Sequence, residues 1–182
     1  MKIKLLKKFM LLALVTDMFA VESGVYIELG AGSGTKKQLN TKDGDYIAQS
    51  SYVGSVYLGY QADIFRIEFE DSYKSDTLKS YKGDSIDGDF TQNTQMFNLY
   101  YSGYNESKFI TTLGVGAGIS SIEVQDIKDS NIFSYQAMFS IGYMKTKDII
   151  ITPKYSYTRT SKSDHFERNS DQILSLNIRY LF

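Results

Sequence analysis

The chain has 182 residues, of which 42% are hydrophobic and 23% charged, and this length and mixture are typical of one folded domain. The formal net charge of -1 gives no electrostatic case for nucleic acid as a partner. The absence of cysteine excludes disulfide bonds, thiolate chemistry and a lipid-modified N-terminal cysteine.

The first twenty residues are predicted to be a secretory signal peptide. Four lysines in MKIKLLKK precede the apolar run FMLLALV, and the small residue Ala20 follows, which is the layout of an export signal. A transmembrane helix needs about 18 apolar residues, but Lys8 and Asp17 limit this run to a shorter stretch. We therefore expect residues 1–20 to be removed and residues 21–182 to form the mature domain.

Beyond Ala20 the apolar residues recur at every second position, which is the period of a β-strand. In IFRIEFE, for example, Phe65, Ile67 and Phe69 alternate with charged residues. The segments of this kind are residues 24–32, 52–61, 64–70, 96–104, 109–119, 133–143, 149–158 and 173–182. Eight strands of about ten residues match the length that a tilted strand needs to cross a bilayer.

The connections between these segments alternate in length. The short polar turns are residues 61–63, 105–108 and 145–148. The longer, charged connections, which are predicted to be loops, are roughly residues 34–48, 72–92, 121–131 and 160–171. Such alternation is expected of an even-stranded membrane barrel with both termini on one side of the membrane.

The polar faces of the predicted strands favour a membrane barrel over a soluble one. A soluble barrel turns its apolar face inward, whereas a membrane barrel turns it outward to lipid and encloses a polar interior. The few charged residues on these faces are balanced in sign, which fits an interior in which buried charges must pair. These candidate interior residues are Glu28, Arg66, Glu68, Glu70, Lys154 and Arg179. We expect Glu28 and Arg179 to pair where the first and last strands meet, with Arg66 as an optional third member.

Aromatic residues gather toward the ends of the predicted strands. Tyrosine favours a membrane–water interface, where its ring lies in the apolar zone and its hydroxyl group reaches the headgroups. The residues concerned are Tyr26, Tyr60, Tyr73, Tyr104, Phe133, Tyr143, Tyr157 and Tyr180. Together with the export signal, they favour a membrane barrel over an exported soluble barrel or sandwich.

Two segments, FNLYYSGYNESKFITTLGVGAGIS (97–120) and ITPKYSYTR (151–159), resemble strands of a known family. This family is the small outer-membrane barrels of Gram-negative bacteria, in particular the opacity-like and OmpA/OmpX-like group. The resemblance implies an all-β fold, namely an eight-stranded antiparallel up-and-down transmembrane β-barrel in the cell outer membrane. It also implies that the barrel-assembly machinery recognises the C-terminal strand. The alternating residues of this signal are Leu174, Leu176, Ile178, Tyr180 and Phe182.

Two kinds of motif suggest ligand binding, and each has a simpler explanation. The glycines of GAGSG (30–34) and GVGAG (114–118) follow period two and no helix follows them. We therefore expect them to make room in a narrow barrel and not to bind a nucleotide. The Asp-Gly sequences at 42–46 and 83–90 lack the twelve-residue calcium pattern and are expected to be turns. No cofactor or metal is expected.

His165 is the only histidine. The resemblance includes two enzyme families that act on lipid A, a deacylase and a palmitoyltransferase, and each uses a histidine with a serine or carboxylate. The residues of this type near His165 are Ser163, Asp164, Glu167 and Ser170, but the His-x-Ser-Asn spacing of the deacylase is absent. We therefore expect a solvated histidine in a mobile loop of a protein that is not an enzyme. A lipid-modifying enzyme centred on His165 is the alternative.

The leading expectation for function is a monomeric surface protein with an adhesive, ligand-binding or envelope-structural role. The barrel would be the scaffold, and four loops outside the cell would bind a host or surface ligand. Outer-membrane lipid and lipopolysaccharide would surround it. A narrow channel for small solutes is a further alternative, although eight strands enclose a space that side chains can fill.

Overall fold

The computed structural model of the chain describes residues 23–34, 38–42, 44–82, 84–104, 108–124 and 127–182. The predicted signal peptide, residues 1–20, lies outside these residues. Among the described residues no helix is long and apolar enough to cross a membrane. The strands are β1 (Gly24–Gly34), β2 (Gln38–Asn40), β3 (Asp45–Ala62), β4 (Phe65–Tyr81), β5 (Asp84–Tyr104), β6 (Phe109–Val124), β7 (Ile127–Met144), β8 (Ile149–Thr160) and β9 (Asn169–Leu181).

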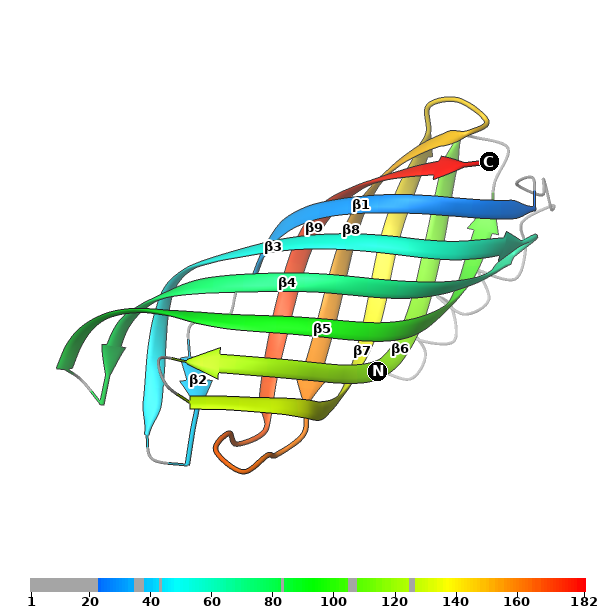
Figure 1. The fold of residues 1–182 in the computed structure, drawn as a ribbon. Helices are drawn as coiled ribbons and strands as arrows, with labels where there is room; N and C mark the ends of the chain where they lie inside the picture. The colour runs from blue at the N-terminus through cyan, green and yellow to red at the C-terminus, as the bar shows by residue number, and fades with distance from the viewer. Residues whose placement is uncertain (1–22, 35–37, 43, 83, 105–107, 125–126) are drawn as a thin grey trace, which may run out of the picture.

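The strands form a closed barrel (Figure 1). Successive strands pair antiparallel, and β1 closes the sheet because it pairs with both β9 and β3. The short strand β2 adds to β3 beyond this closure. Closure satisfies the backbone groups of strands that would otherwise be edges, which a barrel in hydrocarbon requires. The predicted fold class, an eight-stranded antiparallel up-and-down barrel, is confirmed.

The two ends of the barrel differ. The first end, the terminal end, carries Gly24, Phe182 and the tight turns after β3 and β7. The other end, the hairpin end, carries the connections from β4 to β5 and from β6 to β7. In Figure 1 the β4–β5 hairpin reaches far to the left, on the side away from the C-terminus.

Large apolar side chains cover the outside of the barrel near the terminal end. Their exposed fractions run from 37% for Tyr157 to 76% for Phe182, so much of their apolar surface is not covered by protein and needs a lipid environment. We call this surface the apolar belt. Toward the hairpin end we bound the belt at Ala31, Val56, Phe69, Phe97, Ile119, Phe133, Tyr157 and Leu174. The exposed rings of Tyr52 and Tyr73 lie beyond an outward Gly54 and Asp71 and are not counted in it.

The strands continue well past the apolar belt. β4 has 17 residues and β5 has 21, so the prediction of loops at 72–92 and 121–131 is wrong. Lys74, Asp76 and Leu78 still point inward in alternation with outward residues. The prediction failed because it followed apolar residues alone, whereas here polar residues carry the alternation on both faces.

Apolar residues also close the interior at both ends. The hairpin-end cluster consists of Tyr46, Leu78, Phe90, Ile122, Val124, Ile132 and Phe166. The terminal-end cluster consists of Tyr26, Ile110, Ile150 and Leu181. Between them the interior is polar, so the expected polar interior is one layer between two apolar ones.

The inward glycines of β6 make room for their neighbours. A Cβ atom at Gly114 would meet the ring of Tyr100, and one at Gly118 would meet the backbone carbonyl oxygen of Gln95. In contrast, a Cβ atom at Gly54 would meet no atom within 4 Å. The expected role of the GVGAG glycines, space in a narrow barrel, agrees with these contacts.

We predict that Gly118→Ala destabilises the barrel by about 1–3 kcal/mol, because the added methyl group must displace the backbone of β5. Gly54→Ala, the matched control in open space, should be neutral or stabilising by up to about 1 kcal/mol. Urea unfolding of both variants in phosphatidylcholine vesicles measures the difference. Equal free energies of unfolding for the two variants would contradict this account.

Candidate functional site

The six predicted interior charges all point into the barrel and are buried. At the closing strand pair, Arg179 lies opposite Glu28 in the register of β1 and β9. The Arg179 Nε donates to Glu28 Oε2 over 2.8 Å, and Asn177 Nδ2 donates to Glu28 Oε1 over 2.6 Å. The structure thus brings Glu28 and Arg179 together. Arg66 pairs elsewhere, with its Nε 3.8 Å from Oε2 of Glu68.

Glu68 is the centre of a second group of contacts. It accepts hydrogen bonds from the hydroxyl groups of Tyr26 and Tyr100, at 2.7 and 2.8 Å. The guanidinium group of Arg66 lies 3.9 Å from the ring centroid of Tyr100 and 5.5 Å from that of Tyr26. Tyr26 is fully buried, so its predicted place at the membrane interface is wrong. Its hydroxyl group prefers the carboxylate of Glu68, which lies inside the barrel.

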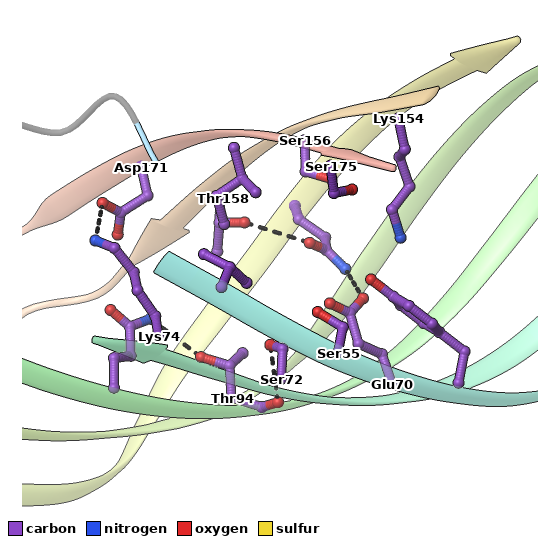
Figure 2. A pocket seen from close by; sticks show the side chains of 15 residues that line it. Ser55, Glu70, Ser72, Lys74, Thr94, Lys154, Ser156, Thr158, Asp171 and Ser175 are labelled. Atoms are coloured by element: carbon purple, nitrogen blue, oxygen red, sulfur yellow. Dashed lines mark hydrogen bonds and ion pairs between the residues drawn. The ribbon is translucent and has the colours of Figure 1, made fainter. Parts of the chain in front are cut away.

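Glu70 and Lys154 border a small cavity in the middle of the interior (Figure 2). Glu70 Oε2 accepts hydrogen bonds from the amides of Asn98 and Gln136, at 2.9 and 2.7 Å. Lys154 Nζ lies 3.8 Å from the ring centroid of Tyr57 but has no hydrogen-bond partner among the described residues. The cavity measures about 20 Å³, which is room for about one water molecule.

The structure adds a third charged group that sequence reasoning missed. Lys74 Nζ lies 2.7 Å from Asp171 Oδ1 and 2.8 Å from Asp76 Oδ2, all three side chains being buried. Figure 2 shows the bond between Lys74 and Asp171 at one side of the cavity. The predicted loops at 72–92 and 160–171 include these residues, because their segments are polar. Continued period-two alternation in the sequence was the signal that could have identified them.

Such an interior is suited to holding the barrel together and not to conduction. The cations Arg66, Lys74 and Arg179 pair with carboxylates, and apolar clusters close both ends of the polar layer. An aqueous pore requires a continuous polar path. Within the described residues, the geometry gives no support to the alternative of a solute channel.

Residues 161–168 cross the hairpin end, and we call them the closing segment. Phe166 has an exposed fraction of 1% and belongs to the hairpin-end cluster. The backbone of this segment bonds to the chain next to β2, from Lys42 N to the His165 carbonyl oxygen and from Glu167 N to the Asn40 carbonyl oxygen. These contacts fix the closing segment across the mouth of the barrel.

Asp129 of β7 fixes the closing segment from the other side. Its Oδ2 accepts hydrogen bonds from Ser163 Oγ and from the backbone N–H of His165, at 2.5 and 2.9 Å. Its Oδ1 lies 2.6 Å from Nδ1 of His165. Burial tends to raise the pKa of Asp129, but the hydrogen bonds from Ser163 and His165 outweigh it and hold this pKa below its usual value.

The expectation of a free, mobile loop around His165 is therefore corrected. The imidazole is half exposed, with one nitrogen bound to Asp129. Ser163 donates to the same carboxylate, so its hydroxyl group is already engaged. Glu167 pairs with Lys162 over 2.6 Å, while Asp164 and Ser170 are exposed. An activated serine needs a bond to the imidazole, and no such bond is present among the described residues.

The remaining predicted residues lie apart from this site. Asp45, Asp84 and Asp89 of the Asp-Gly sequences are exposed, whereas Asp43 and Gly83 lie outside the described residues. No group of three or more histidine or acidic side chains in the described part of the chain could hold a metal ion. The side chains of the predicted assembly signal all point outward from β9 or just beyond it, with exposed fractions of 45% or more. They are Leu174, Leu176, Ile178, Tyr180 and Phe182.

Comparisons with solved structures support the fold. Neisserial surface protein A has a TM-score of 0.68 at 16% identity, covering 88% of this chain and 98% of that chain. OprG of Pseudomonas aeruginosa has a TM-score of 0.60 at 12% identity, covering 91% and 100%. Ail of Yersinia pestis, the attachment invasion locus protein solved with the heparin analogue sucrose octasulfate, has a TM-score of 0.51 at 16% identity, covering 87% and 99%.

No protein-family profile and no curated protein matches the sequence. The chain has the fold of small outer-membrane β-barrels, in agreement with the resemblance seen in its sequence. Its location in the outer membrane stays a prediction.

We predict that Glu28→Ala and Arg179→Ala are strongly non-additive. Each should cost about 3–5 kcal/mol of unfolding free energy, because it leaves the other charge buried and unpaired, and the double variant should cost less than the sum. The exposed pair of Lys128 and Glu123, 2.9 Å apart, is the matched control, with an expected coupling of about 0–1 kcal/mol. Urea unfolding in vesicles measures both cycles. Additive losses for Glu28 and Arg179 would show that their contact does not stabilise the barrel.

We predict that Asp129→Asn loosens the closing segment, because the neutral amide cannot accept all the hydrogen bonds that the carboxylate receives. Amide hydrogen exchange in residues 161–168 should accelerate about tenfold, the change expected for one charged hydrogen bond. Asp164→Asn, at an exposed position of the same segment, is the control and should leave exchange unchanged.

The lowered pKa of Asp129 also predicts a pH dependence. A carboxyl group with a lowered pKa contributes stability above its ordinary value of about 4, and loses it only as the pH falls through the lowered value. The wild-type segment should therefore stay protected from exchange at pH 4 and lose protection below it. Loss of protection already between pH 6 and 5 would show that another group controls the segment.

Proposed function

We propose that this protein is an integral outer-membrane barrel whose hairpin end binds a partner at the cell surface. The observation that carries the proposal is the reach of the strands beyond the apolar belt. On β5, the residues from Asp84 to Gln95 lie past the last belt residue, Phe97; this stretch pairs with β4, and from Phe90 to Gln95 it pairs with β6 as well. The hairpin end is therefore a paired extension of the barrel, and such a scaffold holds its tips in fixed positions for recognition.

The filled interior supports the same proposal. Side chains fill the interior and apolar clusters close both ends. The surface of the hairpin end is therefore the part of the barrel that can contact another molecule. Ail, an attachment protein by name, was solved with a heparin analogue. That property belongs to Ail and offers this chain only a precedent for binding through the same fold.

A lipid-modifying enzyme centred on His165 is the second candidate. The contact between His165 and Asp129 favours it, because a carboxylate at one imidazole nitrogen orients the other nitrogen as a base. Against it stands the engagement of Ser163 with Asp129. Unchanged lipid A chemistry in cells carrying His165→Ala would remove this candidate.

Recognition of the C-terminal strand by the barrel-assembly machinery stays a prediction. The outward side chains of β9 are accessible before lipid covers them, and the ring of Tyr180 lies 5.0 Å from that of Phe182, measured between centroids. Deletion of Phe182 should slow assembly in cells more than it lowers the stability of an assembled barrel.

We predict that reversing charge at the β4–β5 tip alters binding by cells that display the protein. Lys79→Glu with Lys82→Glu changes two exposed residues at the tip, and attachment to epithelial monolayers should change about tenfold, since like and unlike charges at an interface differ by more than 1 kcal/mol. Lys145→Glu with Lys147→Glu, at a turn of the terminal end, is the matched control.

The outcomes separate the candidate roles. A change for the tip variant alone supports surface binding, provided that both variants keep heat-modifiable migration on gels. Equal attachment for both variants would contradict it. If deletion of the whole gene sensitises cells to detergent while the tip variant behaves as wild type, the envelope-structural role is supported instead.

A further inference from the structure

The first outward residue beyond the apolar belt differs in charge around the barrel. On most strands this residue is neutral: Ser33, Gly54, Gln95, Ser121, Asn131 and Gln172. The charged exceptions among the described strands are Asp71 on β4 and Arg159 on β8. These two strands are four positions apart in either direction around the closed sheet. The rim of the belt therefore has a basic side and an acidic side.

The two charges differ in whether they have a partner. Asp71 Oδ1 accepts a hydrogen bond from Asn93 Nδ2 over 3.3 Å. Arg159, by contrast, has no ion pair or side-chain hydrogen bond within the described part of the chain. The planar guanidinium group can donate two parallel hydrogen bonds to one oxyanion, so an unpaired one at a membrane boundary is suited to a phosphate group.

The surroundings of Arg159 fit a lipid headgroup. Tyr135 lies directly opposite on β7, and Tyr157 lies two residues earlier on the same outward face of β8. Tyr157 ends the apolar belt on β8, and on β7 the belt continues one outward position past Tyr135 to Phe133, so Arg159 lies at the edge of the belt beside aromatic rings, where headgroups are expected. Ser170 is its partner on β9.

A second unpaired cation lies close to Arg159. Arg168 is exposed and precedes Ser170 by two residues, which is about 7 Å along an extended chain. No ion pair of Arg168 occurs among the described residues. The basic side of the rim thus offers two guanidinium groups at the level where headgroups lie.

We propose that Arg159, with Arg168, binds the phosphate of a lipid headgroup in the membrane leaflet at the hairpin end. The lipid's acyl chains would lie against Tyr157 and the apolar belt of β8 and β9. Because the proposed phosphate site adjoins the apolar belt, it favours a phosphate that is attached to acyl chains over soluble phosphate. The inference does not depend on the proposed surface-binding function, because it concerns the barrel wall and not the tips.

Native mass spectrometry of the folded barrel in neutral detergent, titrated with diphosphorylated lipid A, tests the proposal. Wild type should retain one lipid, and Arg159→Gln should weaken retention about fivefold, the contribution of one basic residue near a charged membrane surface. The double variant Arg159→Gln with Arg168→Gln should weaken it further. Since Arg159 points outward, heat-modifiable migration should show an intact barrel in each variant.

Two control variants and two control ligands decide the outcome. Lys128→Gln changes net charge as Arg159→Gln does, but at an exposed pair beyond the belt, and Asp71→Asn changes the opposite side of the rim. Neither should weaken lipid retention. Unphosphorylated lipid A should bind wild type about fivefold more weakly, and inorganic phosphate should not displace the lipid at equal concentration. The proposal would be overturned if Lys128→Gln lost as much lipid as Arg159→Gln, or if Arg159→Gln retained lipid in full. It would also be overturned if unphosphorylated lipid A bound wild type as tightly as diphosphorylated lipid A, or if inorganic phosphate displaced the lipid.

Discussion

The pairing of β1 with β9 is the constraint on which the rest of this structure depends. A sheet in hydrocarbon cannot leave backbone N–H and C=O groups unpaired, so the first and last strands must meet. Once they meet, every residue is assigned to the inside or the outside by its place in the alternation. Lipid then requires apolar residues outside, and the narrow interior requires polar residues that satisfy one another. The contact of Glu28 with Arg179 lies on this closing pair, so the interior network and the backbone closure support each other at one place.

The sequence predicted the parts of the fold in which apolar residues show the alternation. Strand identity, barrel closure, the inward direction of Glu28 and Arg179 and the outward direction of Leu176 and Ile178 all followed from period two. The parts beyond the belt were not predicted, since Lys74 and Asp76 look like loop residues when only hydrophobicity is counted. Period two does assign Tyr26 to the inward face that holds Glu28, and the prediction of an interface position overlooked this. Period two could not place Asp129, which lies beside a register shift between β6 and β7. Tyr26 lies inside because its hydroxyl group bonds to Glu68, and Asp129 meets the closing segment through contacts that are remote in sequence.

Barrels of this size are filled by side chains, and here the filling includes apolar clusters at both ends. The shape and charge of the outer surface, in contrast, differ from one side of the barrel to another. A paired extension rises on one side of the belt, a closing segment crosses the mouth, and a basic side and an acidic side oppose each other at the rim. Binding properties of this protein are therefore best sought in the geometry of its strand ends.

The two apolar clusters also limit how fast a molecule held between them can leave the barrel. A water molecule between Lys154 and Glu70 would have no polar route to either end of the barrel, since Phe166 seals one end and Tyr26, Ile110, Ile150 and Leu181 seal the other. It would leave only when an end cluster loosens. The residence time of an interior water molecule would therefore report on fluctuations of the barrel ends. It would be long when the closing segment is bound by Asp129 and shorter when the segment is released.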